Sequence, residues 1–160
     1  MLDGNAVPQD TNFTLIDFDE EALAHVSNQL ETRQSTHAFT CVRENLVHLA
    51  LRRKALAIPP QDVVYSIGLI DYFNDKLVSR LIDFSWSVLK PGGRLILGNF
   101  HPRNTCKAFM DHILGWRLIH RDEQDMHNLF ERSAFRRRCT RIFFEPENVN
   151  LFAECTKNGS

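Results

Sequence analysis

Three residues that could contact a ligand each follow a short apolar run of this sequence: Asp17, Gly68 and Arg103. Ligands of open α/β sheets bind outside the carboxyl ends of the strands, so these are the positions where we expect binding groups. A carboxylate such as Asp17 can accept two hydroxyl donors, and a guanidinium such as Arg103 pairs with a carboxylate through two hydrogen bonds. The residue types therefore predict a polar small-molecule site at one edge of a sheet.

The central run ends in Ser66, Ile67 and Gly68. Gly68 would let the backbone approach a bound molecule closely, because glycine carries no side chain. Asp71 and Tyr72 come next and are predicted to face a substrate. The alternative is that Asp71 starts a turn and Tyr72 packs half-buried.

Helix capping is the competing interpretation at the other two positions. Asp17 lies near a helix start, where Asp19 is the better candidate for the cap. Arg103 is followed by Asn104, whose commoner role would be to cap the next helix.

Strands and helices alternate along the chain. We expect strands at 13–18, 38–42, 63–67 and 95–97, helices at 19–31, 44–56, 77–89, 104–114 and 123–130, a short extended piece at 116–120, and a C-terminal antiparallel hairpin of 139–144 and 151–155. The helix 77–89 is stopped by Lys-Pro-Gly-Gly at 90–93, so the flanking strands should be parallel neighbours. The pattern implies a doubly wound α/β sheet.

Composition and charge exclude several classes of protein. The chain has 160 residues and a net charge of −1, which fits one domain and gives no global field for nucleic acid or an anionic membrane. No apolar run is long enough to span a bilayer, and no signal peptide is visible. The four cysteines lack C-x-x-C spacing and the histidines lack H-E-x-x-H spacing. We therefore expect a cytoplasmic protein without a metal site.

The order helix, Leu-Lys-Pro-Gly-Gly, apolar strand resembles the fourth and fifth strands of class I S-adenosylmethionine-dependent methyltransferases. The segments VVYSIGLIDYF and GNFHPRN, with MDHILGWRLIHRDEQDM further on, resemble bacterial methyltransferases of the subgroup that makes 3-hydroxy fatty acid methyl ester (extracellular factor) signals. The resemblance implies a Rossmann-like sheet and S-adenosyl-L-methionine as cofactor. It also implies a small-molecule acceptor such as a fatty acid carboxylate.

Site residues follow from the resemblance. Asp17 would accept hydrogen bonds from the cofactor ribose, and Glu44 or Asn45 would lie near the adenine amino group unless they cap a helix instead. Ser66 and Gly68 would complete the cofactor contacts. The acceptor side would include Asp71, Tyr72 and Arg103. The subgroup-like segment adds four residues that could shape the acceptor pocket, although a solvated surface is their default interpretation: Arg117, Arg121, Asp122 and Asp125.

One motif of the family is absent. Its domain opens with a strand and a G-x-G-x-G turn, and none of the seven glycines forms that pattern ahead of Asp17. In the family that first strand is central, so its absence predicts two half-sheets with unpaired edges. We therefore expect residues 1–160 to form a single, partial methyltransferase domain. A partner chain would supply the missing strand, or the chain would form a homo-oligomer.

Two other functions remain open at this point. A nicotinamide-dependent oxidoreductase would also use an acidic residue such as Asp17 for its ribose, although the Pro-Gly-Gly turn and the terminal hairpin argue against it. A truncated domain without catalysis could serve a structural or interaction role. No catalytic residue is assigned, because an ionised carboxylate acceptor requires no general base.

Overall fold

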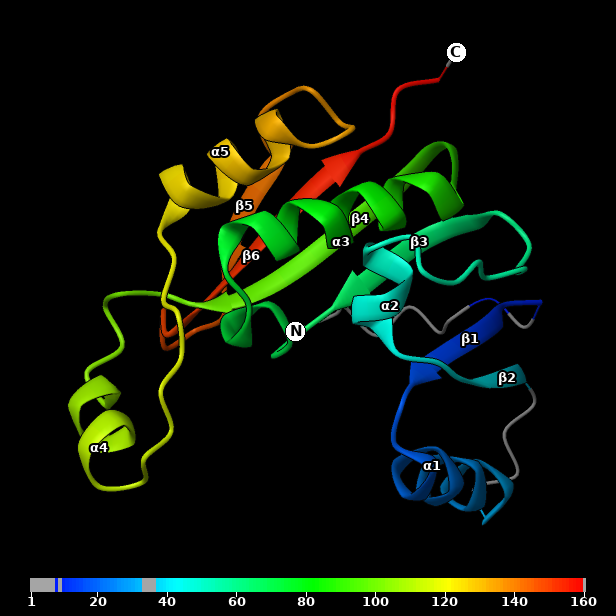
Figure 1. The fold of residues 1–160 in the computed structure, drawn as a ribbon, viewed down its shortest axis with the longest axis horizontal. Coiled ribbons are helices and arrows are strands. Elements are labelled where there is room, and N and C mark those ends of the chain that lie inside the picture. The colour runs from blue at the N-terminus through cyan, green and yellow to red at the C-terminus, as the bar shows by residue number, and fades with distance from the viewer. Residues whose placement is uncertain (1–7, 9, 33–36, 160) are drawn as a thin grey trace. The chain divides into compact units, whose positions relative to one another are not determined.

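The computed structural model describes residue 8, residues 10–32 and residues 37–159 (Figure 1). They form two compact units, of which the first ends at Leu49 and the second begins at Ala50. Each unit has its own sheet: the first holds β1 and β2, and the second holds four strands in the order β3-β4-β6-β5.

The first unit is a β–α–β element followed by a short helix. β1 (Asn12–Asp17) and β2 (Ala38–Arg43) pair in parallel, and α1 (Glu20–Thr32) connects them. Asp19 starts α1, because its carboxylate accepts the backbone N–H groups of Glu21 at 2.9 Å and Ala22 at 3.3 Å. The predicted strands, helix and Asp19 cap are thus confirmed.

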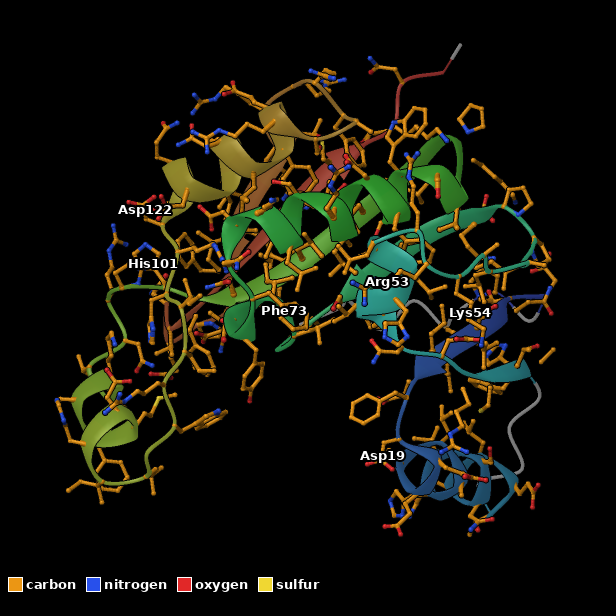
Figure 2. All side chains as sticks on the ribbon, in the orientation of Figure 1. Asp19, Arg53, Lys54, Phe73, His101 and Asp122 are labelled. Atoms are coloured by element: carbon orange, nitrogen blue, oxygen red, sulfur yellow. The ribbon has the colours of Figure 1, made fainter. Side chains whose placement is uncertain are left out.

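The next helix is much shorter than the sequence pattern suggested. α2 covers Leu46–Ala50 rather than 44–56. Arg52 has a φ of 55°, a left-handed conformation that a right-handed helix cannot include. The prediction that Arg52, Arg53 and Lys54 occupy the end of this helix was therefore wrong; Arg53 and Lys54 are labelled in Figure 2.

The second unit is built on a mixed four-stranded sheet. β3 (Gln61–Ser66) and β4 (Leu89–Phe100) are parallel, as predicted, and α3 (Asp75–Val88) connects them after a 3-10 turn at Ile70–Tyr72. The predicted hairpin is also present: β5 (Arg141–Phe144) pairs antiparallel with β6 (Asn150–Thr156), and β6 pairs antiparallel with β4.

Both ends of α3 have identifiable causes. The side chain of Asn74 accepts the Leu77 N–H at 3.0 Å and so caps the start. At the other end, Lys157 Nζ donates to the carbonyls of Trp86 at 2.9 Å and Leu89 at 2.7 Å, where a helix favours a cation. The Pro-Gly-Gly segment stops the helix as predicted, but it lies within the bounds of β4 rather than in a separate turn. Gly92 has a φ of +79° there, and the pairing of β3 with β4 shifts its register between Gln61 and Val63.

The hydrophobic core lies between one face of the sheet and two helices, α3 and α5 (Glu123–Arg132) (Figure 1). Alternate residues of β4 and β6 point to this face and are fully buried: Leu95, Leu97, Leu151, Ala153 and Cys155. The helices contribute Val78, Ile82, Met126 and Phe130, each 0% exposed. This packing fixes the carboxyl ends of β3 and β4, where the candidate residues of the second unit lie.

The segment between β4 and α5 has little regular structure. α4 covers only Lys107–His112, not 104–114, and residues 116–120 form no strand. In the part of the chain that the structure describes, no helix is long and apolar enough to cross a membrane.

Candidate functional site

In the first unit, three predicted cofactor residues lie together at the carboxyl ends of β1 and β2. Asp17 lies opposite Arg43 in the parallel pair, and its carbonyl accepts the Glu44 N–H at 2.9 Å. The Asp17 carboxylate is half-buried, and its Oδ1 accepts the Asp19 N–H at 3.0 Å. A carboxylate has up to four lone-pair positions, so this bond leaves capacity for further donors.

Asn45 has a local structural role. Its Oδ1 accepts the Val47 N–H at 2.9 Å, and its carbonyl accepts the Leu49 N–H at 3.1 Å. The helix-capping alternative is therefore confirmed for Asn45. Its contact with adenine, like that of Glu44, stays a prediction.

In the second unit, Ser66 and Gly68 mark the carboxyl end of β3. Ser66 lies opposite Leu97 of β4 and is half-buried. Gly68 has a φ of +76°, a backbone conformation that favours glycine over residues with a side chain. A Cβ built on Gly68 would have no heavy atom within 4 Å. The backbone at Gly68 is therefore open to close approach by a ligand.

Asp71 is the most deeply buried candidate, at 1% exposure. Its Oδ1 accepts the Phe100 N–H at 2.7 Å, while its Oδ2 has no hydrogen-bond partner. Burial raises the pKa of this carboxyl group, and hydrogen bonds and the nearby Arg121 offset part of the effect. Asp71 thus holds the end of β4 beside the 3-10 turn; its predicted contact with substrate stays a prediction.

Tyr72 is 54% exposed and belongs to a small aromatic group. Its hydroxyl oxygen accepts the indole N–H of Trp116 at 2.8 Å. The Trp116 ring packs edge-on against Phe100 with centroids 6.2 Å apart, and His120 lies 5.8 Å from the same phenyl ring. This group offers an apolar surface with a hydroxyl at its edge.

Arg103 is exposed and lies two residues after His101, a buried histidine that pairs with the partly exposed Glu123. His101, labelled in Figure 2, is 4% exposed, and its Nε2 lies 3.1 Å from Glu123 Oε2. Its Nδ1 accepts the Arg103 backbone N–H at 3.1 Å, so Nε2 carries the hydrogen that Glu123 accepts. Both ring nitrogens are therefore occupied, and His101 positions the loop rather than serving as a base.

Glu123 is the hydrogen-bond acceptor in the His101–Glu123 pair. A hydrogen bond from its own backbone N–H lowers the pKa of Glu123, and the bond from His101 lowers it further. The loop that carries Arg103 is thereby tied to the start of α5.

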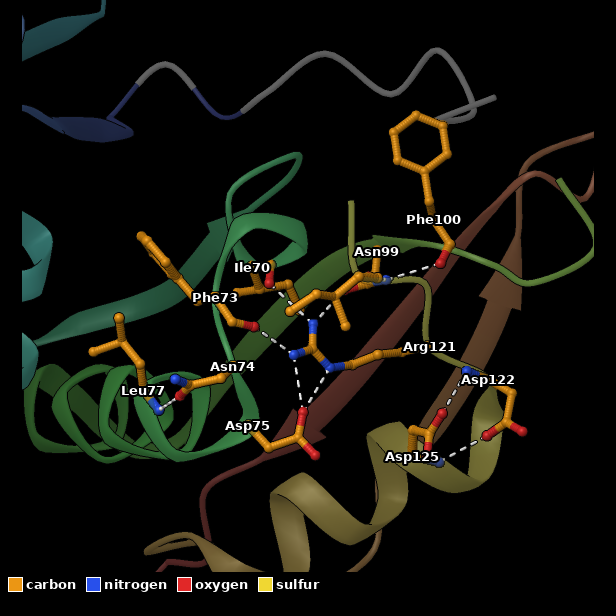
Figure 3. Close-up of polar contacts among 11 residues, drawn as sticks. Ile70, Phe73, Asn74, Asp75, Leu77, Asn99, Phe100, Arg121, Asp122 and Asp125 are labelled. Carbon is orange, nitrogen blue, oxygen red and sulfur yellow. Dashed lines mark hydrogen bonds and ion pairs between the residues drawn. The ribbon is translucent and has the colours of Figure 1, made fainter. Parts of the chain in front are cut away.

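Arg121, expected at the surface, is 2% exposed and lies at the centre of a polar network (Figure 3). Its Nε and Nη2 donate to Asp75 Oδ1 at 3.1 and 2.9 Å, and Nη2 also donates to the Phe73 carbonyl at 2.6 Å. Nη1 donates to the carbonyl of Ile70 and to Asn99 Oδ1, both at 2.9 Å. Arg121 thus connects the 3-10 turn, the start of α3 and the end of β4.

Two acidic residues of the same segment have a local role as well. Asp122 accepts the Asp125 N–H at 2.8 Å, and Asp125 accepts the Asp122 N–H at 3.1 Å, which is a capping box at the start of α5 (Figure 3). Among the described residues, no group of three or more His, Cys, Asp or Glu side chains could hold a metal ion.

No protein-family model matches the sequence, and no match among curated proteins is significant. Solved structures do share its fold. A possible exported protein from Bordetella parapertussis superposes with a TM-score of 0.68 at 19% identity, covering 91% of this chain and 53% of its own. The magnesium protoporphyrin IX methyltransferase of Synechocystis PCC 6803, with bound SAH, gives 0.65 at 16% identity, covering 91% and 63%.

A third similar structure is an O-methyltransferase family protein from Burkholderia thailandensis, with a TM-score of 0.67 at 11% identity and coverage of 92% and 44%. The chain therefore has the α/β, Rossmann-like fold of S-adenosylmethionine-dependent methyltransferases, as predicted. It spans between 44% and 63% of the length of these three proteins.

Proposed function

We propose that this chain is part of an S-adenosylmethionine-dependent methyltransferase domain. The observation that carries the proposal is the position of Asp17 at the carboxyl end of the first of two parallel strands, in a fold shared with methyltransferases. Bound S-adenosylmethionine would supply an activated methyl group on a sulfonium. The protein's contribution would be to bind and orient the reactants.

Asp17 is the proposed ribose ligand. Its carboxylate accepts one backbone N–H and keeps capacity for two hydroxyl donors. The residues present fit the cofactor at this point. The glycine-rich turn that contacts the methionine end in the family is not in the sequence, so we assign no residue of this chain to that part.

The proposed acceptor is a small molecule with a carboxylate, such as a fatty acid. Arg103 supplies an exposed guanidinium, and Tyr72 with Trp116 supplies an exposed apolar surface in the same unit. Asp71 would support this region from beneath through its bond to the Phe100 N–H. A cytoplasmic location fits the four unpaired cysteines, Cys41, Cys106, Cys139 and Cys155.

Calorimetric titration with S-adenosylmethionine tests the proposal. We expect saturable binding by the wild-type chain and a loss of about tenfold in affinity for Asp17→Asn, because the amide is a weaker acceptor for ribose hydroxyls. Asp10→Asn, an exposed change outside the strand, should leave binding unchanged. Equal affinities for all three proteins would contradict the ribose role of Asp17.

Titration with NAD and NADH separates the oxidoreductase alternative. Binding of a nicotinamide cofactor without any binding of S-adenosylmethionine would favour that class and overturn methyl transfer.

The proposed acceptor site has its own test. Fatty acids should protect the Tyr72–Trp116 region from hydrogen exchange, and Arg103→Gln should weaken this protection.

A second candidate is a structural or interaction role without catalysis. The observation that favours it is the division of the described strands into two separate sheets. If the folded chain binds neither S-adenosylmethionine nor a nicotinamide cofactor, this role becomes the better interpretation of the chain by itself.

A further inference from the structure

The hydroxyl group of Tyr72 can donate a hydrogen bond to a ligand. Its oxygen accepts the indole N–H of Trp116 at 2.8 Å. The direction of this bond is fixed, because an indole nitrogen is a donor only. A tyrosine hydroxyl has one proton and two lone pairs, so the bond from Trp116 leaves the proton available. Among the described residues none accepts that proton, and Tyr72 is 54% exposed.

Backbone hydrogen bonds hold the two side chains beside each other. Tyr72 ends the 3-10 turn at the carboxyl end of β3. The Trp116 N–H donates to the Met110 carbonyl at 2.8 Å. Three residues later, the Ile119 N–H donates to the Asp71 carbonyl at 2.8 Å, which ties this segment to the turn. The indole of Trp116 therefore orients the Tyr72 hydroxyl before any ligand binds.

An apolar surface lies beside this hydroxyl. Trp116 and Ile119 are each 42% exposed, and the Trp116 ring packs edge-on against Phe100 at an angle of 80°. Side chains that are already fixed lose little conformational entropy when a ligand covers them. A ligand with an apolar body would bury part of this surface and place its polar group at the Tyr72 hydroxyl.

The charges of the same segment favour an anionic ligand. Lys107 pairs with Asp111, whereas Arg103 and Arg117 are exposed and form no ion pair with a described residue. Asp71 is 1% exposed and presents no charged surface of its own. Aromatic faces alone would also attract a cation, but the two arginines oppose one.

We propose that the Tyr72 hydroxyl, oriented by Trp116, donates a hydrogen bond to the carboxylate of an apolar small molecule and selects acids over alcohols and amines of equal length. That this acid is the methyl acceptor rests on the proposed function. A charge-assisted bond to a carboxylate is about twice as strong as a neutral one. An ammonium group only donates and cannot accept the proton. Tyr72 is then the specificity-determining residue and Trp116 a positioning residue.

Calorimetric titration with three probes of equal chain length tests the selection: octanoate, 1-octanol and octylamine. We expect octanoate to bind about tenfold more tightly than either of the others, as one hydrogen bond to a charged group provides. Tyr72→Phe removes only the hydroxyl and should abolish this preference. Trp116→Phe keeps a ring but loses the N–H, and should reduce the preference about threefold, because the hydroxyl must then be ordered on binding.

The chain offers matched controls for both variants. Tyr65 and Trp86 are its other tyrosine and its other tryptophan, and Tyr65 is 62% exposed. Tyr65→Phe and Trp86→Phe should leave the preference for octanoate unchanged. Trp86→Phe also leaves Trp116 as the single tryptophan, so octanoate should change its fluorescence. Circular dichroism should show that each variant is folded.

Three results would overturn the proposal: no binding of octanoate, equal affinities for the three probes, or a preference that Tyr72→Phe leaves intact. An unchanged preference in Trp116→Phe would remove its positioning role. The titrations contain no S-adenosylmethionine, so the two proposals fail separately. Selective octanoate binding by a chain that does not bind S-adenosylmethionine would keep the acid site and contradict methyl transfer. The opposite result would keep the proposed cofactor and contradict the acid site.

Discussion

Asp71 carries a carboxylate that is buried with only one of its oxygens hydrogen-bonded. Burial raises the pKa of this group in the folded state above its unfolded value of about 4. The folded state therefore binds the proton more tightly than the unfolded state does. The contribution of Asp71 to the free energy of unfolding falls as the pH rises from the unfolded pKa to the folded pKa. The destabilisation caused by burying the ionised Asp71 carboxylate is absent below the unfolded pKa and complete above the folded pKa.

Asp71→Asn should remove this pH dependence. The amide oxygen can still accept the Phe100 N–H, so the variant should gain stability relative to wild type as the pH rises from about 4, and the difference should level off above the folded pKa. Urea unfolding of both proteins between about pH 4 and 8 measures it. Asp10→Asn serves as the exposed control, and a stability difference that does not change with pH would contradict the prediction.

Arg121 shows what a sequence pattern could not provide. Its partners Ile70, Phe73 and Asp75 lie 51, 48 and 46 positions away along the chain. An arginine between a histidine and an aspartate has the local pattern of a surface group, and only the fold reveals that its five N–H groups donate to the 3-10 turn, the start of α3 and the end of β4. The same applies to the pairing of His101 with Glu123.

Arg121→Lys should destabilise the protein by about 2–4 kcal/mol, because an ammonium cannot satisfy five acceptor contacts arranged for a planar guanidinium. The free energy of unfolding from urea denaturation provides the measurement. Arg117→Lys is the matched control: it is the same change on an exposed arginine and should have almost no effect. Similar losses in both variants would show that the network around Arg121 contributes little.

At the scale of elements, Gly93 lies where strand β4 passes close to two backbone carbonyls. A Cβ at this position would lie 2.9 Å from the Lys90 oxygen and 3.0 Å from the Gln61 oxygen, and neither backbone atom can move without disturbing the β3–β4 pair. We expect Gly93→Ala to destabilise the protein by about 1–3 kcal/mol.

Thermal or urea unfolding measures the effect of Gly93→Ala, with Gly159→Ala as control because its Cβ would meet no atom within 4 Å. Equal stability of the two variants would mean that the β3–β4 connection tolerates a shift of its backbone.

Elements with a strong periodic pattern were predicted well, whereas two short helices were predicted too long. The apolar spacing of α3 and the alternation of β6 reflect real buried faces, with Val78, Leu81 and Ile82 buried on the helix. The helices predicted at 44–56 and 104–114 contain only Leu46–Ala50 and Lys107–His112. Their ends depend on backbone conformation, such as the φ of 55° at Arg52, which hydrophobic periodicity does not report.

At the scale of the whole molecule, the two separate sheets match the expectation of half-sheets that followed from the missing glycine-rich turn. The positions of the candidate residues at strand ends could be predicted, because parallel strands place their carboxyl ends together. Which of them contact a ligand could not be predicted, because several candidates, such as Asn45, also satisfy local backbone groups.

The two sheets should also differ in stability. The first unit has only a two-stranded parallel sheet, and Leu23 is the only buried residue of α1. In the second unit, β4 and β6 pair at seven positions and pack against the core that α3 and α5 cover. A two-stranded sheet is at best marginally stable by itself, so amides of β1 and β2 should exchange at least about 100-fold faster than those of β4 and β6. Hydrogen exchange with mass spectrometry resolves the strands separately. Uniform protection and a single cooperative transition would contradict the partial-domain hypothesis, because they would require the first unit to be stabilised as strongly as the second.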